Sequence, residues 1–222
     1  MRICVKFSRE GFSKYLAHLD MQRMFVRAIK RADLPAKYSA GFNPHMNISF
    51  AYPLGVGIET RGDYLEFFTT EDIDIAAAEQ ALRLQMPEGF GIQAMGELDE
   101  KTGKLMALTQ QAEYRLEGFC PEFAAWMQTF LQKDSYMVER ERKGKVRTID
   151  IRPMVKECVF LEDGAIRLRV DNSGSASLNP ALLLKAAAKE SGKDEMRARI
   201  IRMELYTVTE DGAVQPITAL FA

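Results

Sequence analysis

The sequence is poor in the residues that build disulfide and metal sites. Its 222 residues include three cysteines and two histidines. The cysteines Cys4, Cys120 and Cys158 are odd in number and far apart, which argues against a disulfide scaffold and predicts buried, reduced thiols. No His-x-x-x-His or Cys-x-x-Cys pairing occurs, so we expect no metal site in this chain.

Long apolar runs and standard phosphate-binding motifs are also missing. No run approaches the roughly 18 apolar residues of a membrane span, and the N-terminus MRICVKFSRE lacks the apolar core of a secretory signal. Together with reduced thiols, these absences predict a cytoplasmic protein with no membrane partner. Neither GxGxxG nor GxxxxGK[ST] occurs, which argues against nucleotide binding by a standard loop.

Charge is distributed unevenly along the chain, although the formal net charge is −1. Residues 1–52 hold nine basic and three acidic residues, whereas 53–134 hold six basic and fifteen acidic residues. The rest of the chain is weakly basic, and its cations concentrate in RERKGKVR at 140–147. Two basic regions therefore flank an acidic middle, and each basic region is a candidate contact for an anionic partner.

Hydrophobic periodicity predicts strands alternating with helices. Strict alternation in RICVKFSR predicts a strand at 2–9, and apolar residues at helical spacing predict an amphipathic helix over 19–32 with a basic outer face. Further strands are expected at 36–39, 47–52, 64–68, 91–98, 112–119, 136–142, 146–151, 157–170 and 197–209. Further helices are expected at 73–84, 121–132 and 180–190.

This order of elements predicts an α+β fold of two tandem ferredoxin-like units. Each unit would have the order β-α-β-β-α-β, with an antiparallel sheet and its helices on one face. We expect the first unit at 1–100, a polar linker at 101–111, and the second unit at 112–222. The repeat concerns the order of elements only, because the two halves share no evident residue-level similarity.

Basic residues interleaved with aromatic residues are the strongest functional signal. Cations can contact phosphates and aromatic rings can stack on bases, so these residues predict RNA binding, with an ordinary solvated basic face as the alternative. The candidates on the first helix are Arg23, Arg27, Lys30 and Arg31, and those in the following turn are Tyr38, Phe42, Asn43 and His45. The candidates on the second basic run are Arg140, Arg142, Lys143, Lys145 and Arg147.

Both histidines lie in the first basic region. His18 and His45 with Asp20 form a candidate acid–base set. The alternative interpretation has His18 capping the first helix and His45 hydrogen-bonded to backbone within a turn. The sequence leaves both interpretations open.

Two strings carry a resemblance to a known family. The string YLAHLDMQRMFVRAIKRADLPAKYSAGFNPHMNISFAYPLGVG, with the later TIDIRPMV, resembles the bacterial radical-SAM-linked family of unknown function. That family's members are fused to a radical SAM protein or encoded beside one. In the family, proline often follows the histidine of GFNPH, where this chain has Met46.

The resemblance implies a division of labour between two proteins. A radical SAM enzyme holds its [4Fe–4S] cluster through three closely spaced cysteines, and cysteines 4, 120 and 158 do not have that spacing. We therefore expect no cofactor in this chain, with S-adenosylmethionine and the cluster on a separate radical SAM partner. The genes that accompany the family, which include ribonuclease G-type enzymes and ribosomal proteins, suggest RNA modification or a ribosome-associated role.

Three functional hypotheses follow. The first is an accessory subunit that recognises ribosomal or transfer RNA for the radical SAM partner, with no contact to DNA. The second is an RNA-processing or RNA-modifying enzyme that uses His18 and His45. The third is a protein docking module without RNA contact. The sequence favours a non-catalytic subunit over an enzyme that acts alone.

Overall fold

The computed structural model describes residues 1–99, 101–142 and 144–222, without the side chains of residues 141, 142 and 145. The strands are β1 (Arg2–Arg9), β2 (Ile48–Phe50), β3 (Glu59–Phe68), β4 (Phe90–Glu97), β5 (Gln111–Glu117), β6 (Met137–Arg142), β7 (Lys145–Asp150), β8 (Val155–Phe160), β9 (Ile166–Asp171), β10 (Arg199–Val208) and β11 (Val214–Pro216). The helices are α1 (His18–Arg31), α2 (Ile75–Arg83), α3 (Leu105–Leu108), α4 (Pro121–Leu131) and α5 (Pro180–Glu190), with 3-10 turns η1 (Gly11–Tyr15) and η2 (Ile217–Leu220).

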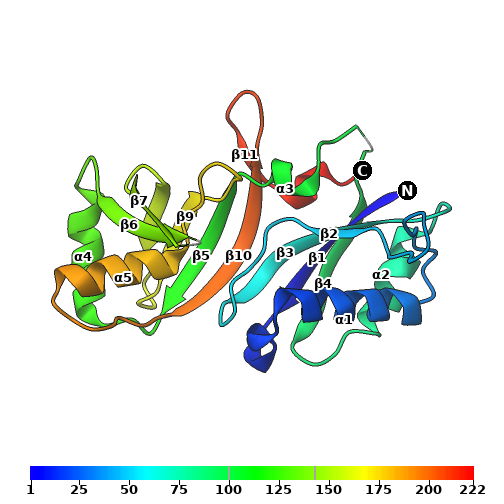
Figure 1. The fold of residues 1–222 in the computed structure, drawn as a ribbon, viewed down its shortest axis with the longest axis horizontal. Coiled ribbons are helices and arrows are strands. Elements are labelled where there is room, and N and C mark those ends of the chain that lie inside the picture. The colour runs from blue at the N-terminus through cyan, green and yellow to red at the C-terminus, as the bar shows by residue number, and fades with distance from the viewer. Residues whose placement is uncertain (100, 143) are drawn as a thin grey trace. The chain divides into compact units, whose positions relative to one another are not determined.

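These elements form a mixed α+β fold (Figure 1). Nine strands belong to one large, mostly antiparallel sheet in the order β4-β1-β3-β10-β5-β9-β8, with β11 on β10 and β2 on β3. The remaining pair, β6 and β7, forms a separate hairpin. The predicted α+β class with antiparallel pairing is confirmed. None of the described helices is long and apolar enough to cross a membrane.

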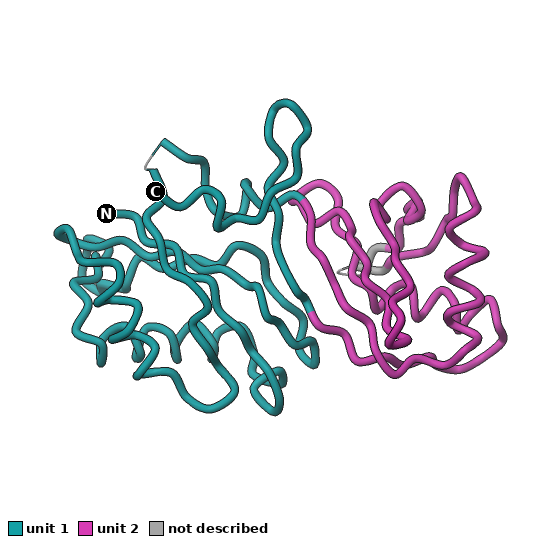
Figure 2. Tube along the Cα trace, turned by 180° about the vertical axis from the view of Figure 1, so that it is seen from behind, with its two compact units in different colours: residues 1–110, 202–222 teal, residues 111–201 magenta. Residues whose placement is uncertain are grey.

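The chain divides into two compact units (Figure 2). The first consists of residues 1–110 and 202–222, and the second of residues 111–201. The predicted division placed the whole of 112–222 in the second unit, whereas the structure groups 202–222 with the first. The reason is contact with the N-terminal strands: the backbone N–H of Ala222 donates to the carbonyl of Glu97 at 3.0 Å.

The core of the first unit lies between its sheet and the helices α1 and α2, which lie on one face of that sheet (Figure 1). Alternation in β1 buries Ile3, Val5 and Phe7 on this face, as predicted. Phe25 from α1 and Leu82 from α2 are fully buried in the same cluster. Burial of this apolar face drives the packing of the helices on the sheet.

Of the predicted linker at 101–111, residues 101–110 are folded into the first unit, and Gln111 begins β5. Arg2 donates from its guanidinium to the carbonyls of Thr102 at 2.5 Å and Gly103 at 2.8 Å, and it pairs with Glu66 at 2.7 Å. Leu105 is fully buried in the short helix α3. The segment is therefore held in place by the buried Arg2 and by the apolar side chain of Leu105. Its polar first residues had suggested a linker between the two units instead.

A buried ion pair joins β10 to β3 within the first unit. Arg202 and Asp63 form an ion pair at 2.5 Å with side-chain exposures of 1% and 2%, and Arg202 also donates to the carbonyl of Tyr52 at 3.1 Å. Gly62 lies beside this pair on β3. A Cβ atom at Gly62 would lie 2.3 Å from the carbonyl oxygen of Met203, so only glycine permits this close approach.

A second buried guanidinium holds the loop between β2 and β3. Arg9 is 1% exposed and donates to the carbonyls of Ile58 at 2.8 Å and Gly55 at 3.2 Å, and to that of Leu16 at 3.4 Å. Burial lowers the pKa of Arg9 below its ordinary value. The glycine-rich end of YSAGFNPHMNISFAYPLGVG is thus fixed by a buried charge.

The second unit contains β5 to β9, α4 and α5. Here the predicted strand at 157–170 is wrong, because the segment forms the hairpin of β8 and β9. The turn is closed by the N–H of Leu161 donating to the carbonyl of Ala165 at 2.8 Å, and Gly164 has φ +81°. Glycine readily adopts this left-handed conformation, so the Asp163-Gly164 pair in the sequence indicated a turn between two strands.

The buried ion pair predicts a large loss of stability on truncation. We expect Asp63→Ala to lower the free energy of unfolding by about 3–5 kcal/mol, because Arg202 would remain buried without its carboxylate. Urea unfolding of the full chain measures this change. The exposed pair between Asp20 and Arg23 is the matched control, for which Asp20→Ala is expected to cost less than about 1 kcal/mol. Equal losses for the two variants would contradict the role given to burial.

Candidate nucleic-acid interface

The outer face of α1 carries the exposed cations predicted from the sequence. The inner face buries Met21, Phe25, Ala28 and Ile29, which confirms the amphipathic helix. The opposite face forms a shallow groove of about 300 Å³. Its lining residues are Gln22, Arg23, Val26, Arg27 and Lys30.

These cations differ in whether they already form hydrogen bonds or ion pairs within the protein. Arg23 pairs with Asp20 at 3.0 Å, and Arg31 donates to the carbonyl of Gln85 at 2.7 Å. Within the described residues, Arg27 makes no hydrogen bond or ion pair. The pair at Arg23 is exposed and therefore weak, so it can be exchanged for a phosphate at little cost. Arg27 is the freest cation of the helix.

The segment after α1 is a closed turn. The predicted strand at 36–39 is reduced to isolated bridges, one of which joins Tyr38 to Met46. Ser39 fixes the turn: its N–H donates to the carbonyl of His45 at 2.8 Å, and its hydroxyl accepts from the N–H of His45 at 3.1 Å. Met46 is buried in the core and anchors the turn. Phe42, at the tip, is fully exposed.

One contact joins this turn to the helix. The Lys30 ammonium lies 5.4 Å from the centre of the Tyr38 ring, a cation–π distance. Lys30 and Tyr38 therefore join the exposed side of α1 to the turn that follows it. We call this region the helix–turn surface, and define it by Arg23, Arg27, Lys30, Tyr38 and Phe42.

The structure places the candidate acid–base residues in separate contacts. His18 does not cap α1, because the N-cap is Ala17 and no side-chain cap bond forms there. Its ring instead packs on Phe50, with ring centres 5.0 Å apart, and its buried Nδ1 has no hydrogen-bond partner among the described residues. Asp20 faces Arg23, as described above. These contacts give His18 a packing role.

The His45 side chain helps to close the turn, as one interpretation of the sequence predicted, but it contacts a side chain and not the predicted backbone group. Its Nδ1 lies 2.9 Å from the hydroxyl of Ser39. Within the described residues, no hydrogen bond or ion pair joins His18, Asp20 and His45 to one another. Asn43 is exposed near the same tip.

The second basic run forms the hairpin of β6 and β7. Arg140 lies opposite Arg147 in the register, and Arg140 donates to the carbonyl of Ser177 at 3.2 Å. Arg147 is exposed. Lys143 lies outside the described residues, as do the side chains of Arg142 and Lys145. This hairpin belongs to the second unit, whereas the helix–turn surface belongs to the first.

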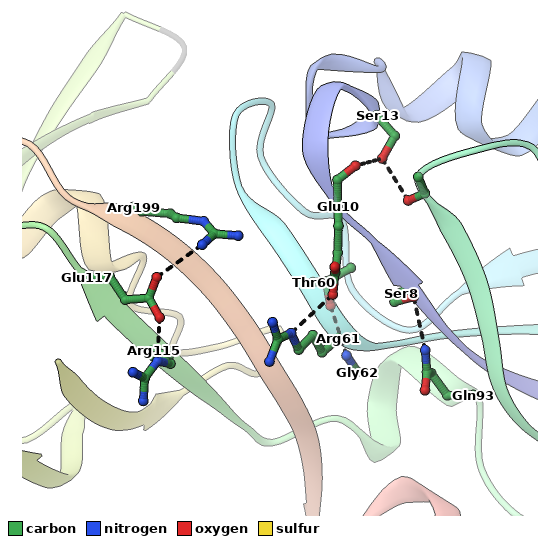
Figure 3. Close-up of polar contacts among 11 residues, drawn as sticks. Ser8, Glu10, Ser13, Thr60, Arg61, Gly62, Gln93, Arg115, Glu117 and Arg199 are labelled. Carbon is green, nitrogen blue, oxygen red and sulfur yellow. Dashed lines mark hydrogen bonds and ion pairs between the residues drawn. The ribbon is translucent and has the colours of Figure 1, made fainter. Parts of the chain in front are cut away.

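Other arginines of the second unit are occupied by carboxylates. Glu117 contacts Arg115 at 2.5 Å and accepts from Arg199 at 3.2 Å (Figure 3). Arg115 also contacts Asp163. Nearby, Glu157 pairs with two arginines of β9. These cations are balanced by acids, so they offer less attraction to a phosphate backbone than α1 does.

The sequence did not reveal a polar cluster at the end of α5. Glu190 accepts from the Trp126 ring N–H at 2.7 Å and from the Tyr136 hydroxyl at 2.5 Å, and pairs with Lys133 at 3.3 Å. Burial and this carboxylate raise the pKa of Tyr136 to about 12. In the sequence, the rare Trp126 and the nearby Tyr136 could have suggested an aromatic cluster, but nothing indicated that Glu190 would join them.

The three cysteines are spread over different elements. Cys4 is buried in β1, as predicted. Cys120, the N-cap residue of α4, and Cys158 in β8 are only half-buried, so the prediction of buried thiols is wrong for these two. Burial raises the pKa of Cys158 to about 11 and that of Cys4 further, so both remain thiols at neutral pH. In the part of the chain that the structure describes, no group of three His, Cys, Asp or Glu residues is arranged to hold a metal ion.

Comparison with known proteins identifies a family but no activity. A family model described as an uncharacterised protein conserved in bacteria, DUF2344, matches residues 2–180. No curated protein matches the chain. The matched region includes α1, the turn after it, and the second unit as far as the start of α5. The chain therefore belongs to the DUF2344 family of uncharacterised bacterial proteins.

Proposed function

We propose that this chain is an accessory subunit that binds RNA for a radical SAM enzyme, and that the helix–turn surface makes the main contact. The observation that carries the proposal is the cation–π contact between Lys30 and Tyr38, which brings a cation of α1 next to an aromatic ring of the following turn. Ribosomal or transfer RNA is the proposed ligand.

The chemistry of this surface suits unpaired nucleotides. Arg27 and Lys30 would neutralise phosphates, and the fully exposed ring of Phe42 would stack on a base. Proteins recognise specific RNA sequences mainly in loops and single strands, where bases are free to stack on aromatic rings. An RNA loop is therefore a better match for this surface than a regular duplex.

The radical SAM partner is supported by the resemblance of the HLD and GFNPH strings. It is also supported by the placement of the thiols, because cysteines on β1, β8 and before α4 do not form the loop that binds a [4Fe–4S] cluster. The cluster and S-adenosylmethionine would then be held by the partner. This chain would supply the recognition of the substrate.

The same proposal includes tandem ferredoxin-like topology. In the first unit the strand order β4-β1-β3-β2 matches the β-α-β-β-α-β pattern. The strands β5, β9 and β8 of the second unit, with β10 beside β5, support the same pattern in the order β10-β5-β9-β8, with the hairpin of β6 and β7 as an insertion after α4. Each unit would then present helices on one face of its sheet.

One prediction of this proposal concerns Arg27 and Lys30 on the outer face of α1. We expect the double variant Arg27→Ala/Lys30→Ala to weaken RNA binding and to flatten its salt dependence. For single-stranded RNA, the loss of two phosphate contacts lowers the slope of log K against log salt by about 1.4. Fluorescence anisotropy with labelled transfer RNA and ribosomal RNA fragments, across a salt series, measures both effects.

Arg83→Ala is the matched control, because Arg83 is an exposed helical arginine of the same unit that pairs with Glu79. This variant is expected to bind RNA like the wild type. If the wild type does not bind, or if the double variant binds with an unchanged salt slope, the proposed RNA surface is wrong.

The second prediction concerns base stacking at the turn. Phe42→Ala should cost about 1–3 kcal/mol of RNA binding, the usual worth of one stacked base. Stability should not change, because the ring is fully exposed. Phe12→Ala removes another exposed phenylalanine and serves as control. Titration calorimetry and thermal unfolding distinguish the two effects, and equal losses in both variants would count against stacking by Phe42.

The third prediction addresses the enzymatic alternative. If His18 and His45 act as acid–base groups, the purified chain alone should process RNA, and His18→Ala/His45→Ala should abolish that activity. Our proposal expects no turnover by the chain alone and full RNA binding by His18→Ala. Gel analysis of incubated RNA measures turnover, and cleavage that depends on either histidine would replace our proposal with the enzymatic one.

A further inference from the structure

The second unit contains a groove of about 580 Å³ between β6 and α5. Both elements are labelled in Figure 1. This volume is within the range of ordinary ligand sites. None of the candidate binding residues predicted from the sequence lines it.

One wall of the groove is formed by the hairpin of β6 and β7. Four consecutive residues, 136–139, which run from just before β6 into that strand, line the groove, together with Thr148, the partner of Glu139 on β7. Side chains alternate between the two faces of a strand, so a groove on one face would be lined mainly by every second residue. A run of consecutive residues indicates that the main chain of β6 is itself part of the wall.

The main-chain groups at this edge are unpaired. Among the described residues, β6 pairs only with β7, in a two-stranded sheet. The N–H of Ile151 donates to the carbonyl of Tyr136 at 3.0 Å, which marks these two residues as a hydrogen-bonded pair of the hairpin. Such pairs alternate along an antiparallel ladder, so the N–H and C=O groups of Met137 and Glu139 point away from β7.

The opposite wall is one face of α5. Leu182, Lys185, Ala186 and Lys189 recur at helical spacing and line the groove, while Leu183 and Ala187 are buried on the other side. This wall therefore combines an apolar strip with two ammonium groups.

The uncommitted charge of this groove is mainly positive. Lys185 and Lys189 are exposed, and within the described residues neither forms an ion pair. Glu190 is already engaged by Lys133, Trp126 and Tyr136. Glu139 contributes a single exposed carboxylate on the strand side. An acidic ligand therefore complements the α5 wall.

We propose that this groove binds an extended acidic segment of another protein, which adds to the outer edge of β6 as a third strand. The main-chain groups of Met137 and Glu139 would pair with the segment's backbone, and its side chains would alternate between apolar contacts with Leu182 and Ala186 and acidic contacts with Lys185 and Lys189. Strand addition beside a helix is a recurrent mode of peptide recognition. An RNA backbone has no N–H and C=O ladder to match this edge.

This site lies wholly within the second unit and does not depend on the proposed RNA function. It offers a way for the chain to dock onto a second protein while the helix–turn surface stays free.

The test uses the full chain and a displayed library of random peptides about ten residues long, the upper length of an ordinary strand. Peptides enriched on the wild type are counter-selected against Lys185→Glu/Lys189→Glu. The strongest peptide is then synthesised, and its site is mapped by amide shifts in NMR spectra. We expect acidic peptides with alternating apolar residues, whose binding shifts the amides of Met137 and Glu139.

A matched pair of variants separates backbone pairing from side-chain contact. Glu139→Pro removes the outward N–H, and a proline is tolerated at an edge strand when that group is not part of the ladder. Glu139→Ala removes the same carboxylate and keeps the N–H. We expect affinity to fall about tenfold in Glu139→Pro, the effect of losing one good hydrogen bond, and to be retained or improved in Glu139→Ala.

The hairpin must persist for this comparison, so protection of the Val138 amide from hydrogen exchange is measured in both variants. If protection is lost in Glu139→Pro, the same peptide N-methylated at alternate residues is tested on the wild type, where the tenfold loss is again expected.

Three results would overturn the proposal. They are the absence of any enriched peptide, enriched peptides that shift amides away from β6 and α5, and equal binding by Glu139→Pro with an intact hairpin. An oligonucleotide that binds here, loses affinity in Lys185→Glu/Lys189→Glu and ignores Glu139→Pro would assign the groove to RNA instead.

Discussion

The buried ion pair between Arg202 and Asp63 is the interaction on which the first unit depends. Charges at this depth are costly unless they are paired and hydrogen-bonded, so each partner fixes the position of the other. Arg202 also holds the carbonyl of Tyr52, and Arg9 holds the same loop at Gly55 and Ile58. Since Arg9 also contacts the carbonyl of Leu16, just before α1, these buried guanidinium groups help to position the helix that carries the candidate interface.

The two units distribute their charged residues in different ways. In the first unit, Lys30 of α1 lies beside the ring of Tyr38 in the following turn, and Arg27 has no acidic partner within the described residues. In the second unit, arginines such as Arg115 and Arg199 are paired with acids on the strands. Free positive charge there is found on α5, in the groove that this helix shares with β6. The first arrangement suits an RNA backbone, and the second suits an acidic peptide.

The sequence predicted local elements well and their combination less well. The amphipathic pattern located α1, and Pro121 and Pro180 marked the starts of α4 and α5. Predicting one strand over 157–170 failed, because the apolar residues on both sides of the Asp163-Gly164 turn concealed it. One interpretation of the sequence was that the two histidines act together. In the structure His18 packs on Phe50, whereas His45 contacts Ser39.

The sequence by itself determined the fold class, the positions of most helices and strands, and the basic face of α1, because these depend on periodicities of two to four residues. The tertiary structure alone decided that residues 202–222 belong to the first unit, that Lys30 meets Tyr38, and that α5 and β6 line one groove. Such contacts join residues far apart in the chain; Arg202 and Asp63 are 139 positions apart. No local sequence pattern predicts that Arg202 and Asp63 form a pair, because their contact depends on how the strands of the sheet pack together.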